Sequence, residues 1–204
     1  LKRVLSVRGP QSPLHELTME ECFFDHDVAA ELLKLIDPGH LRHFALERSF
    51  KPSAGAYLCD EAWEGLQGLE LYGDLVRVED VEVLLMAPLF HKIQALRIGH
   101  LLDGKGEASG NLVRKLLGWG EGRIAGGAPL IRLGLPGLLH DLETIEELAA
   151  SSVSADLHHL DLRDNILDAS SIEALFLDTS SWPSLTHLRL GGAPFDYGLD
   201  DLLL

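Results

Sequence analysis

A short leucine motif recurs along most of this chain, and its period limits the possible folds more than any other feature. The motif L-x-x-L-x-L occurs seven times, and its second leucine-type position, here called the marker, is occupied by Leu17, Phe44, Leu69, Leu96, Leu133, Leu160 and Leu188. Successive markers are 25 to 28 residues apart, except for a step of 37 residues between Leu96 and Leu133. Such a period predicts a stacked array, because a single unit of this size cannot bury its apolar side alone.

Two copies extend the motif to L-x-x-L-x-L-x-x-N-x-L, which resembles the leucine-rich repeat family. These copies contain Leu157, Leu160, Leu162, Asn165 and Leu167, and Leu14, Leu17, Met19, Cys22 and Phe24. Repeats of this length resemble the ribonuclease-inhibitor-like class, and the resemblance covers about residues 14–204. It implies an α/β fold, a right-handed horseshoe-shaped solenoid of seven repeats. A short parallel sheet would line its concave side, and helices would cover its convex side.

The Asn or Cys position of the longer motif has a structural role in the family, where it bonds buried backbone groups between turns. Asn165 and Cys22 match this position. The other repeats carry Ser49, Asp74, Leu101, Leu138 and Ala193 there. The resemblance therefore implies an irregular array without a continuous hydrogen-bond ladder at this position.

Helical periodicity appears between the markers, as expected for repeats of alternating strand and helix. It predicts helices over residues 26–36, 78–86, 109–119, 140–150 and 169–177. Candidate N-caps are Asp25, Ser109 and Asp168. Residues 51–63 contain Pro52 and Gly55 and predict a short or irregular helix. Residues 1–13 predict either a flanking strand that covers the first sheet edge or the remnant of a preceding repeat.

Composition limits the classes of partner and compartment. The chain has 43 leucines among 204 residues, 46% hydrophobic residues and a net charge of −15. This acidity disfavours nucleic acid and membrane partners, because both carry negative charge. The sequence has no apolar run of about 18 residues that predicts a transmembrane helix. Cys22 and Cys59 are too few for a disulfide scaffold, so we expect a cytoplasmic, reducing location.

A glycine-rich insertion at about residues 103–128 accounts for the long step between markers. It lacks the G-x-x-x-x-G-K-[ST] pattern of a phosphate loop. The segment is either an insertion tolerated at the rim of the array or a binding lobe that carries Trp119. Its glycine content predicts weak local packing in both cases.

The residues that alternate with the framework leucines predict a protein-protein interaction module that belongs to a larger chain. Their side chains would face solvent on the concave side, where they can vary without disturbing the core. The candidate partner-binding residues are Glu20, His43, Arg48, Glu70, Tyr72, Arg97, Arg132, His159, Asp161, Arg163, His187 and Arg189. We expect no catalytic residues, no metal and no cofactor, since no nucleophile motif is present. The alternatives are a regulator or inhibitor of an enzyme such as a GTPase or a toxin and, less favoured, a metal-dependent hydrolase.

Histidines on the expected concave side suggest two further hypotheses, a zinc site and pH-dependent partner binding. His159 and His187 would be matched neighbours on adjacent strands, which is one element of a zinc site. His158 directly precedes His159, however, and consecutive strand residues point to opposite sides of a sheet. Six of the ten histidines fall on expected concave positions, and their protonation near pH 6.5 would make partner binding dependent on pH.

Overall fold

The structure of the chain, a computed structural model, has an α/β architecture built on one parallel sheet. It describes residues 14–21, 27–28, 31–32, 38–48, 63, 65–73, 77–101, 107–123, 127–176 and 181–191. The sheet has seven strands, which lie side by side in the order in which they occur along the chain. The expected α/β class with a parallel sheet is thereby confirmed.

The strands are short, and the marker residues lie next to one another across the whole sheet. They are β1 (Glu16–Glu20), β2 (His43–Glu47), β3 (Gly68–Tyr72), β4 (Ala95–Gly99), β5 (Arg132–Gly134), β6 (His159–Asp161) and β7 (His187–Arg189). All neighbouring strands are parallel, and each marker is paired in register with the next, from Leu17 beside Phe44 to Leu160 beside Leu188. The register predicted from the period is therefore confirmed.

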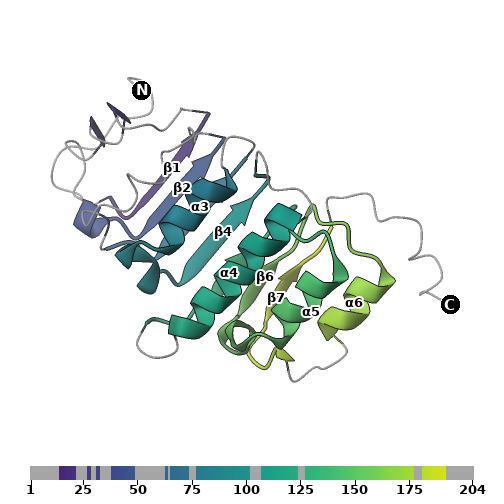
Figure 1. Cartoon of the computed structure of the whole chain (residues 1–204). Coiled ribbons are helices and arrows are strands. Elements are labelled where there is room, and N and C mark those ends of the chain that lie inside the picture. The colour runs from purple at the N-terminus through teal and green to yellow at the C-terminus, as the bar shows by residue number, and fades with distance from the viewer. Residues whose placement is uncertain are drawn as a thin grey trace.

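Helices cover one face of this sheet. The α-helices are α3 (Val78–Leu85), α4 (Glu107–Arg123), α5 (Leu142–Ala150) and α6 (Ala169–Phe176), and the 3-10 helices are η1 (Pro38–His40), η3 (Pro88–His91) and η4 (Ser152–Asp156). Figure 1 shows α3, α4, α5 and α6 lying over the same side of the strands. We call the opposite side, which no helix of the described residues covers, the open face.

The core lies between the sheet and its helices. The marker residues Phe44, Leu69, Leu96, Leu133 and Leu160 are all at most 2% exposed. Toward the edges of the sheet the framework is less covered, since Leu14 and Leu188 are 37% and 36% exposed. The inner repeats are buried because each has a neighbour on both sides, as stacking requires.

The helices from residue 78 onward confirm the sequence periodicity, with one correction at a helix start. Asp168 caps α6, because its Oδ1 accepts hydrogen bonds from Ser171 N at 2.8 Å and from Ser171 Oγ at 2.7 Å. Ser109 is not a cap, because α4 already begins at Glu107 and Ser109 lies inside the helix, fully buried.

The glycine-rich segment holds a packed helix. α4 runs through it, and Leu112, Val113, Leu116 and Leu117 are at most 5% exposed. The expectation of weak packing is therefore wrong for residues 109–117. The apolar spacing of these four side chains outweighs the low helix propensity of the glycines around them.

Asn165 links two successive repeats through buried hydrogen bonds. Its Nδ2 donates to the carbonyl oxygens of Leu162 and Leu135, each at 2.9 Å. Its Oδ1 accepts from Leu139 N at 2.7 Å. The role implied for Asn165 is thus confirmed, whereas Leu101 and Leu138, at the same position of other repeats, are buried apolar side chains.

Several expectations fall on residues outside the described part of the chain. These are the flanking segment 1–13, most of the helix expected at 26–36 with its cap Asp25, most of 51–63, and the residues Cys22, Ser49, Cys59, Asp74 and Ala193. The side chain of Trp119 is also outside it.

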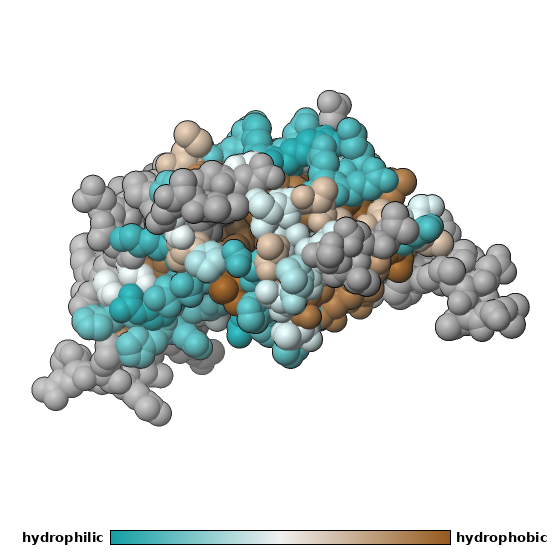
Figure 2. Space-filling model, turned by 90° about the horizontal axis from the view of Figure 1, so that it is seen from below, coloured by the Kyte–Doolittle hydropathy of each residue, from teal (hydrophilic) through white to brown (hydrophobic). Residues whose placement is uncertain are grey.

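One face of the molecule carries polar and hydrophobic residues side by side. Figure 2, a view from below, shows a largely hydrophilic surface with hydrophobic residues visible between the polar ones. The large exposed hydrophobic side chains are Leu14, Val83, Met86, Leu142, Ile166 and Leu188. None of the helices in the described part of the chain combines the length and the apolar character needed to cross a membrane.

The buried marker row predicts a sharp difference between two leucine-type positions only six residues apart. Leu160→Asp places a charge without a partner in the core, where Leu160 is 1% exposed, and should lower the free energy of unfolding by about 3–5 kcal/mol. Ile166→Asp makes the same kind of change at a residue that is 63% exposed and should cost less than about 0.5 kcal/mol. Urea unfolding measures both, and equal losses would contradict the assigned core.

Candidate functional site

The candidate site lies on the open face, where alternate strand residues leave the core. In β1, Glu16, Thr18 and Glu20 are exposed, and the residues between them are buried. A cavity of about 420 Å³ lies over β4 to β7 and extends toward β2 and β3. The cavity is lined by residues of the marker row and of the rows on either side of it. These residues are His43, Glu70, Ala95, Leu96, Arg97, Arg132, Leu133, Gly134, His159, Leu160, Asp161, His187 and Arg189.

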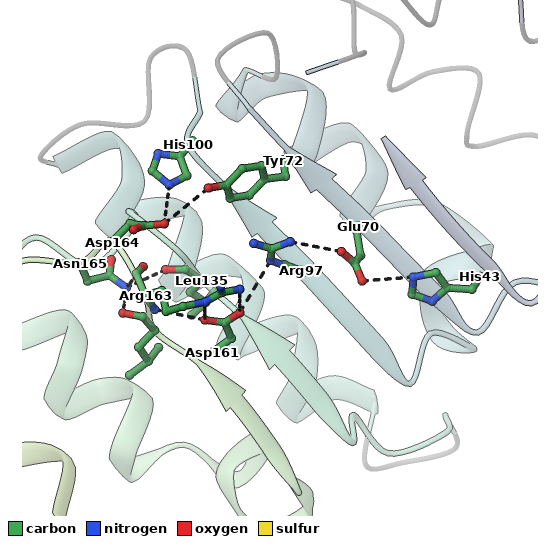
Figure 3. A network of polar contacts seen from close by, with 11 residues as sticks. His43, Glu70, Tyr72, Arg97, His100, Leu135, Asp161, Arg163, Asp164 and Asn165 are labelled. Carbon is green, nitrogen blue, oxygen red and sulfur yellow. Dashed lines mark hydrogen bonds and ion pairs between the residues drawn. The ribbon is translucent and has the colours of Figure 1, made fainter. Parts of the chain in front are cut away.

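A chain of alternating charges crosses this face from β2 to β6 (Figure 3). His43 Nε2 lies 3.2 Å from Glu70 Oε1, and Arg97 Nη1 donates to Glu70 Oε2 at 3.4 Å. On the other side, Arg97 Nε lies 3.9 Å from Asp161 Oδ2. Arg97 therefore connects acidic groups on two strands that are not neighbours of each other.

Gly134 makes this reach possible. It lies in β5 between Arg97 of β4 and Asp161 of β6, in the same row of the sheet. Two strand spacings, about 9.6 Å, separate β4 from β6. A Cβ atom at Gly134 would lie 2.8 Å from Arg97 Cγ, so the arginine side chain crosses β5 through space that any other residue would fill.

Tyr72 and Arg163 hold the two ends of the Arg97–Asp161 pair. The Arg97 guanidinium carbon lies 4.4 Å from the centre of the Tyr72 ring, a cation–π contact. Arg163 donates twice to Asp161, from Nε to Oδ1 at 2.9 Å and from Nη2 to Oδ2 at 2.7 Å. Burial opposes ionisation of Asp161, but the hydrogen bonds and charge of Arg163 outweigh it and hold the pKa of Asp161 below its usual value.

A second polar cluster lies where the strands end. Asp164 Oδ2 accepts from the Tyr72 hydroxyl at 3.5 Å and lies 3.0 Å from His100 Nε2. The Tyr72 and His100 rings meet edge to face, with centroids 4.8 Å apart. Burial and the nearby Asp164 charge raise the pKa of Tyr72, so its hydroxyl stays protonated and available as a donor.

The backbone reason for this cluster is a left-handed residue four positions after each of the first six markers. Positive φ angles occur at Glu21, Arg48, Gly73, His100, Gly137 and Asp164. Each of these residues donates its N–H to a carbonyl at the end of the next strand or two residues after it, for example His100 N to Pro136 O at 3.2 Å. Asp, His and Gly adopt this conformation more readily than most residues, a signal the sequence analysis did not use.

A cationic group occupies the other end of the cavity. Arg132 and Arg189 are exposed, and the rings of His159 and His187 stack on each other, 4.3 Å apart with planes 16° from parallel. Desolvation and the neighbouring charges of His187 and Arg132 lower the pKa of His159. In contrast, the hydrogen bond to Glu70 raises the pKa of His43. The pKa values of His43 and His159 are therefore shifted in opposite directions.

Most of the residues predicted to bind a partner lie together. Eight of them line the cavity: His43, Glu70, Arg97, Arg132, His159, Asp161, His187 and Arg189. Tyr72 and Arg163 contact this group directly. Glu20 and Arg48 lie apart from it and pair with each other at 3.1 Å. Gly134, His100 and Asp164, which shape the site, were not among the predicted binding residues.

The arrangement offers fixed charges and hydrogen-bonding groups to a ligand. Among the described residues, no group of three or more His, Cys, Asp or Glu side chains has the placement needed to hold a metal ion. The described residues that line the cavity include no Ser, Thr, Cys or Lys. Such a surface can bind a ligand of complementary charge.

Comparison with known proteins adds little to this picture. No family model matches the chain. A segment of 45 residues, which is 22% of this chain, is 44% identical to a GTP 3',8-cyclase from Hydrogenovibrio crunogenus (strain DSM 25203 / XCL-2). The chain matches 14% of the length of that enzyme.

The role of Gly134 predicts opposite effects for two Gly→Ala changes. Gly134→Ala should displace Arg97 from its two acidic partners and lower the free energy of unfolding by about 1 kcal/mol. Gly118→Ala, in α4, adds a methyl group that meets nothing within 4 Å, and it should raise stability by about 0.5–1 kcal/mol. Urea unfolding of both variants tests this, and stabilisation by both changes would contradict the role of Gly134.

The His43–Glu70 pair predicts a pH dependence of stability. The pKa of His43 is raised above 6.5, so its contribution is complete below that pH and is lost as pH rises through the raised value. The pKa of Glu70 is lowered below 4.5, so its contribution is lost as pH falls through the lowered value. His43→Gln should therefore flatten the loss of stability that occurs as pH rises above about 6.5 through the raised pKa of His43.

His91→Gln is the matched control for this pH profile. His91 is exposed in η3 and forms no ion pair with a described residue. Thermal unfolding across the pH range should give this variant the wild-type slope. A His43→Gln profile parallel to the wild type would show that the pair does not link stability to pH.

Proposed function

We propose that this chain is a leucine-rich-repeat protein and that it recognises a protein partner through the open face. The observation that carries the proposal is the register of the sheet, in which all seven markers form one row. The helices lie on the other side, and Asn165 bonds two successive repeats, which is the role implied by the resemblance. In this proposal the open face is the concave side of a right-handed solenoid.

Binding at this face is favoured by its rigidity. Most of the binding side chains project from strands whose backbone is fixed by hydrogen bonds to neighbouring strands, so little conformational freedom is lost on association. The ion pairs among His43, Glu70, Arg97 and Asp161 hold four of these side chains in place before a partner arrives. A preorganised, charged surface favours specificity in protein recognition.

Recognition rather than catalysis is proposed because the cavity is lined by charges that mostly pair with one another. The similarity to the GTP 3',8-cyclase supports no catalytic proposal, because it involves 14% of that enzyme. The net charge of −15 supports a protein partner over nucleic acid or membrane. The proposed location is the cytoplasm.

A matched pair of Ala→Trp variants tests the proposed function. Ala95 lies in β4 on the wall of the cavity, and Ala150 is exposed at the end of α5, on the helix side. Trp at residue 95 fills the cavity, whereas Trp at residue 150 leaves the open face unchanged. Proteins captured by the immobilised wild-type chain should be retained by Ala150→Trp and lost with Ala95→Trp, as measured by quantitative mass spectrometry. Retention of the same proteins by both variants would place recognition elsewhere.

A further inference from the structure

The charged residues of the sheet are divided between its two halves. Strands β1 to β3 contain four acidic residues and no Lys or Arg: Glu16, Glu20, Glu47 and Glu70. Strands β4 to β7 contain Arg97, Arg132 and Arg189 against the single acid Asp161. The open face is therefore polarised along the array, although the chain as a whole is strongly acidic.

Arg132 and Arg189 differ from the other arginines of this face. Arg48 pairs with Glu20 and Glu21, and Arg163 pairs with Asp161. Arg132 and Arg189 are exposed at the cavity and form no ion pair with any described residue. The nearest acid in the sheet, Asp161, already accepts two hydrogen bonds from Arg163.

The two histidines complete a group of donors around one end of the cavity. His159 lies beside Arg132 across the β5–β6 pairing and beside His187 across the β6–β7 pairing. The stacked rings occupy the row next to Arg189. A negative group placed here meets two guanidinium groups and two imidazoles, and it relieves the repulsion among them.

We propose that the β5–β7 end of the open face binds a short carboxylate-bearing segment of an acidic protein partner. The carboxylates would be held by Arg132 and Arg189, with His159 and His187 as neighbouring hydrogen-bonding groups. This proposal rests on the proposed function, whose recognition surface it divides into an anion-binding end and an acidic end. The partner surface should carry the opposite polarity, with its acidic residues toward β7 and its basic residues toward β1.

A short acidic segment suits this surface better than a long polyanion. The acidic strand β3 lies two strand spacings from β5, about 9.6 Å, close to the Debye length of about 8 Å at physiological salt. A polyphosphate chain longer than the cavity would therefore meet repulsion from Glu70 and the strands beyond it. A segment of a few residues can occupy the β5–β7 end of the cavity of about 420 Å³ alone, because Glu70 lines the opposite end.

Fluorescence anisotropy with a labelled peptide of alternating glutamate and glycine tests the proposal. The wild-type chain should bind this peptide, and the double variant Arg132→Gln/Arg189→Gln should bind it at least about tenfold more weakly. Raising NaCl from about 50 mM to about 300 mM should also weaken binding. The matched control, Arg77→Gln/Lys115→Gln, removes two exposed cationic side chains outside the cavity and should stay within about twofold of the wild type.

Three outcomes would overturn the proposal. No binding of the acidic peptide to the wild-type chain is the first, and an equal loss in both double variants, which indicates non-specific attraction, is the second. The third is tighter binding of a labelled oligodeoxynucleotide than of the peptide, which indicates a polyphosphate site. The Ala95→Trp comparison decides the proposed function separately, because it depends on filling the cavity and not on the charge of the partner.

Discussion

The alignment of one apolar row across all seven strands is the constraint on which the rest of the structure depends. Because each marker is in register with the next, every residue one position before or after a marker also belongs to a continuous row. Apolar rows then face the helices, and polar rows face the open side. The cavity, the ion pairs that cross strands and the polarity of the face all follow from rows that the buried leucines hold in place.

Most of the fold could be predicted from the sequence, because its determinants are local and repeated. The marker spacing predicted seven strands in register, and apolar periodicity predicted α3, α5 and α6 to within two residues at their ends. The error in α4 has a physical cause. Glycine content suggested weak packing, but burial of Leu112 and its neighbours on one helix face contributes more than glycine costs.

The sequence predicted which residues belong to the candidate site better than it predicted how these residues contact one another. Alternation along the strands identified the residues that line the cavity, since direction in a strand follows from sequence position. This alternation does not predict which of these residues form ion pairs with one another. The contact of Arg97 with Asp161 depends on an absent side chain at Gly134, and the Asp164 cluster depends on left-handed backbone angles after the strands.

The span of Arg97 over Gly134 limits how this array can change its length during evolution. The backbone of each repeat forms the same kind of hydrogen bonds with its neighbours. The gain or loss of one whole repeat would therefore preserve folding in most parts of the array. Between β4 and β6, however, an added unit would carry Asp161 beyond the reach of the arginine, and a lost unit would remove the glycine it crosses. Between β4 and β6, the length of the Arg97 side chain therefore limits the number of repeats.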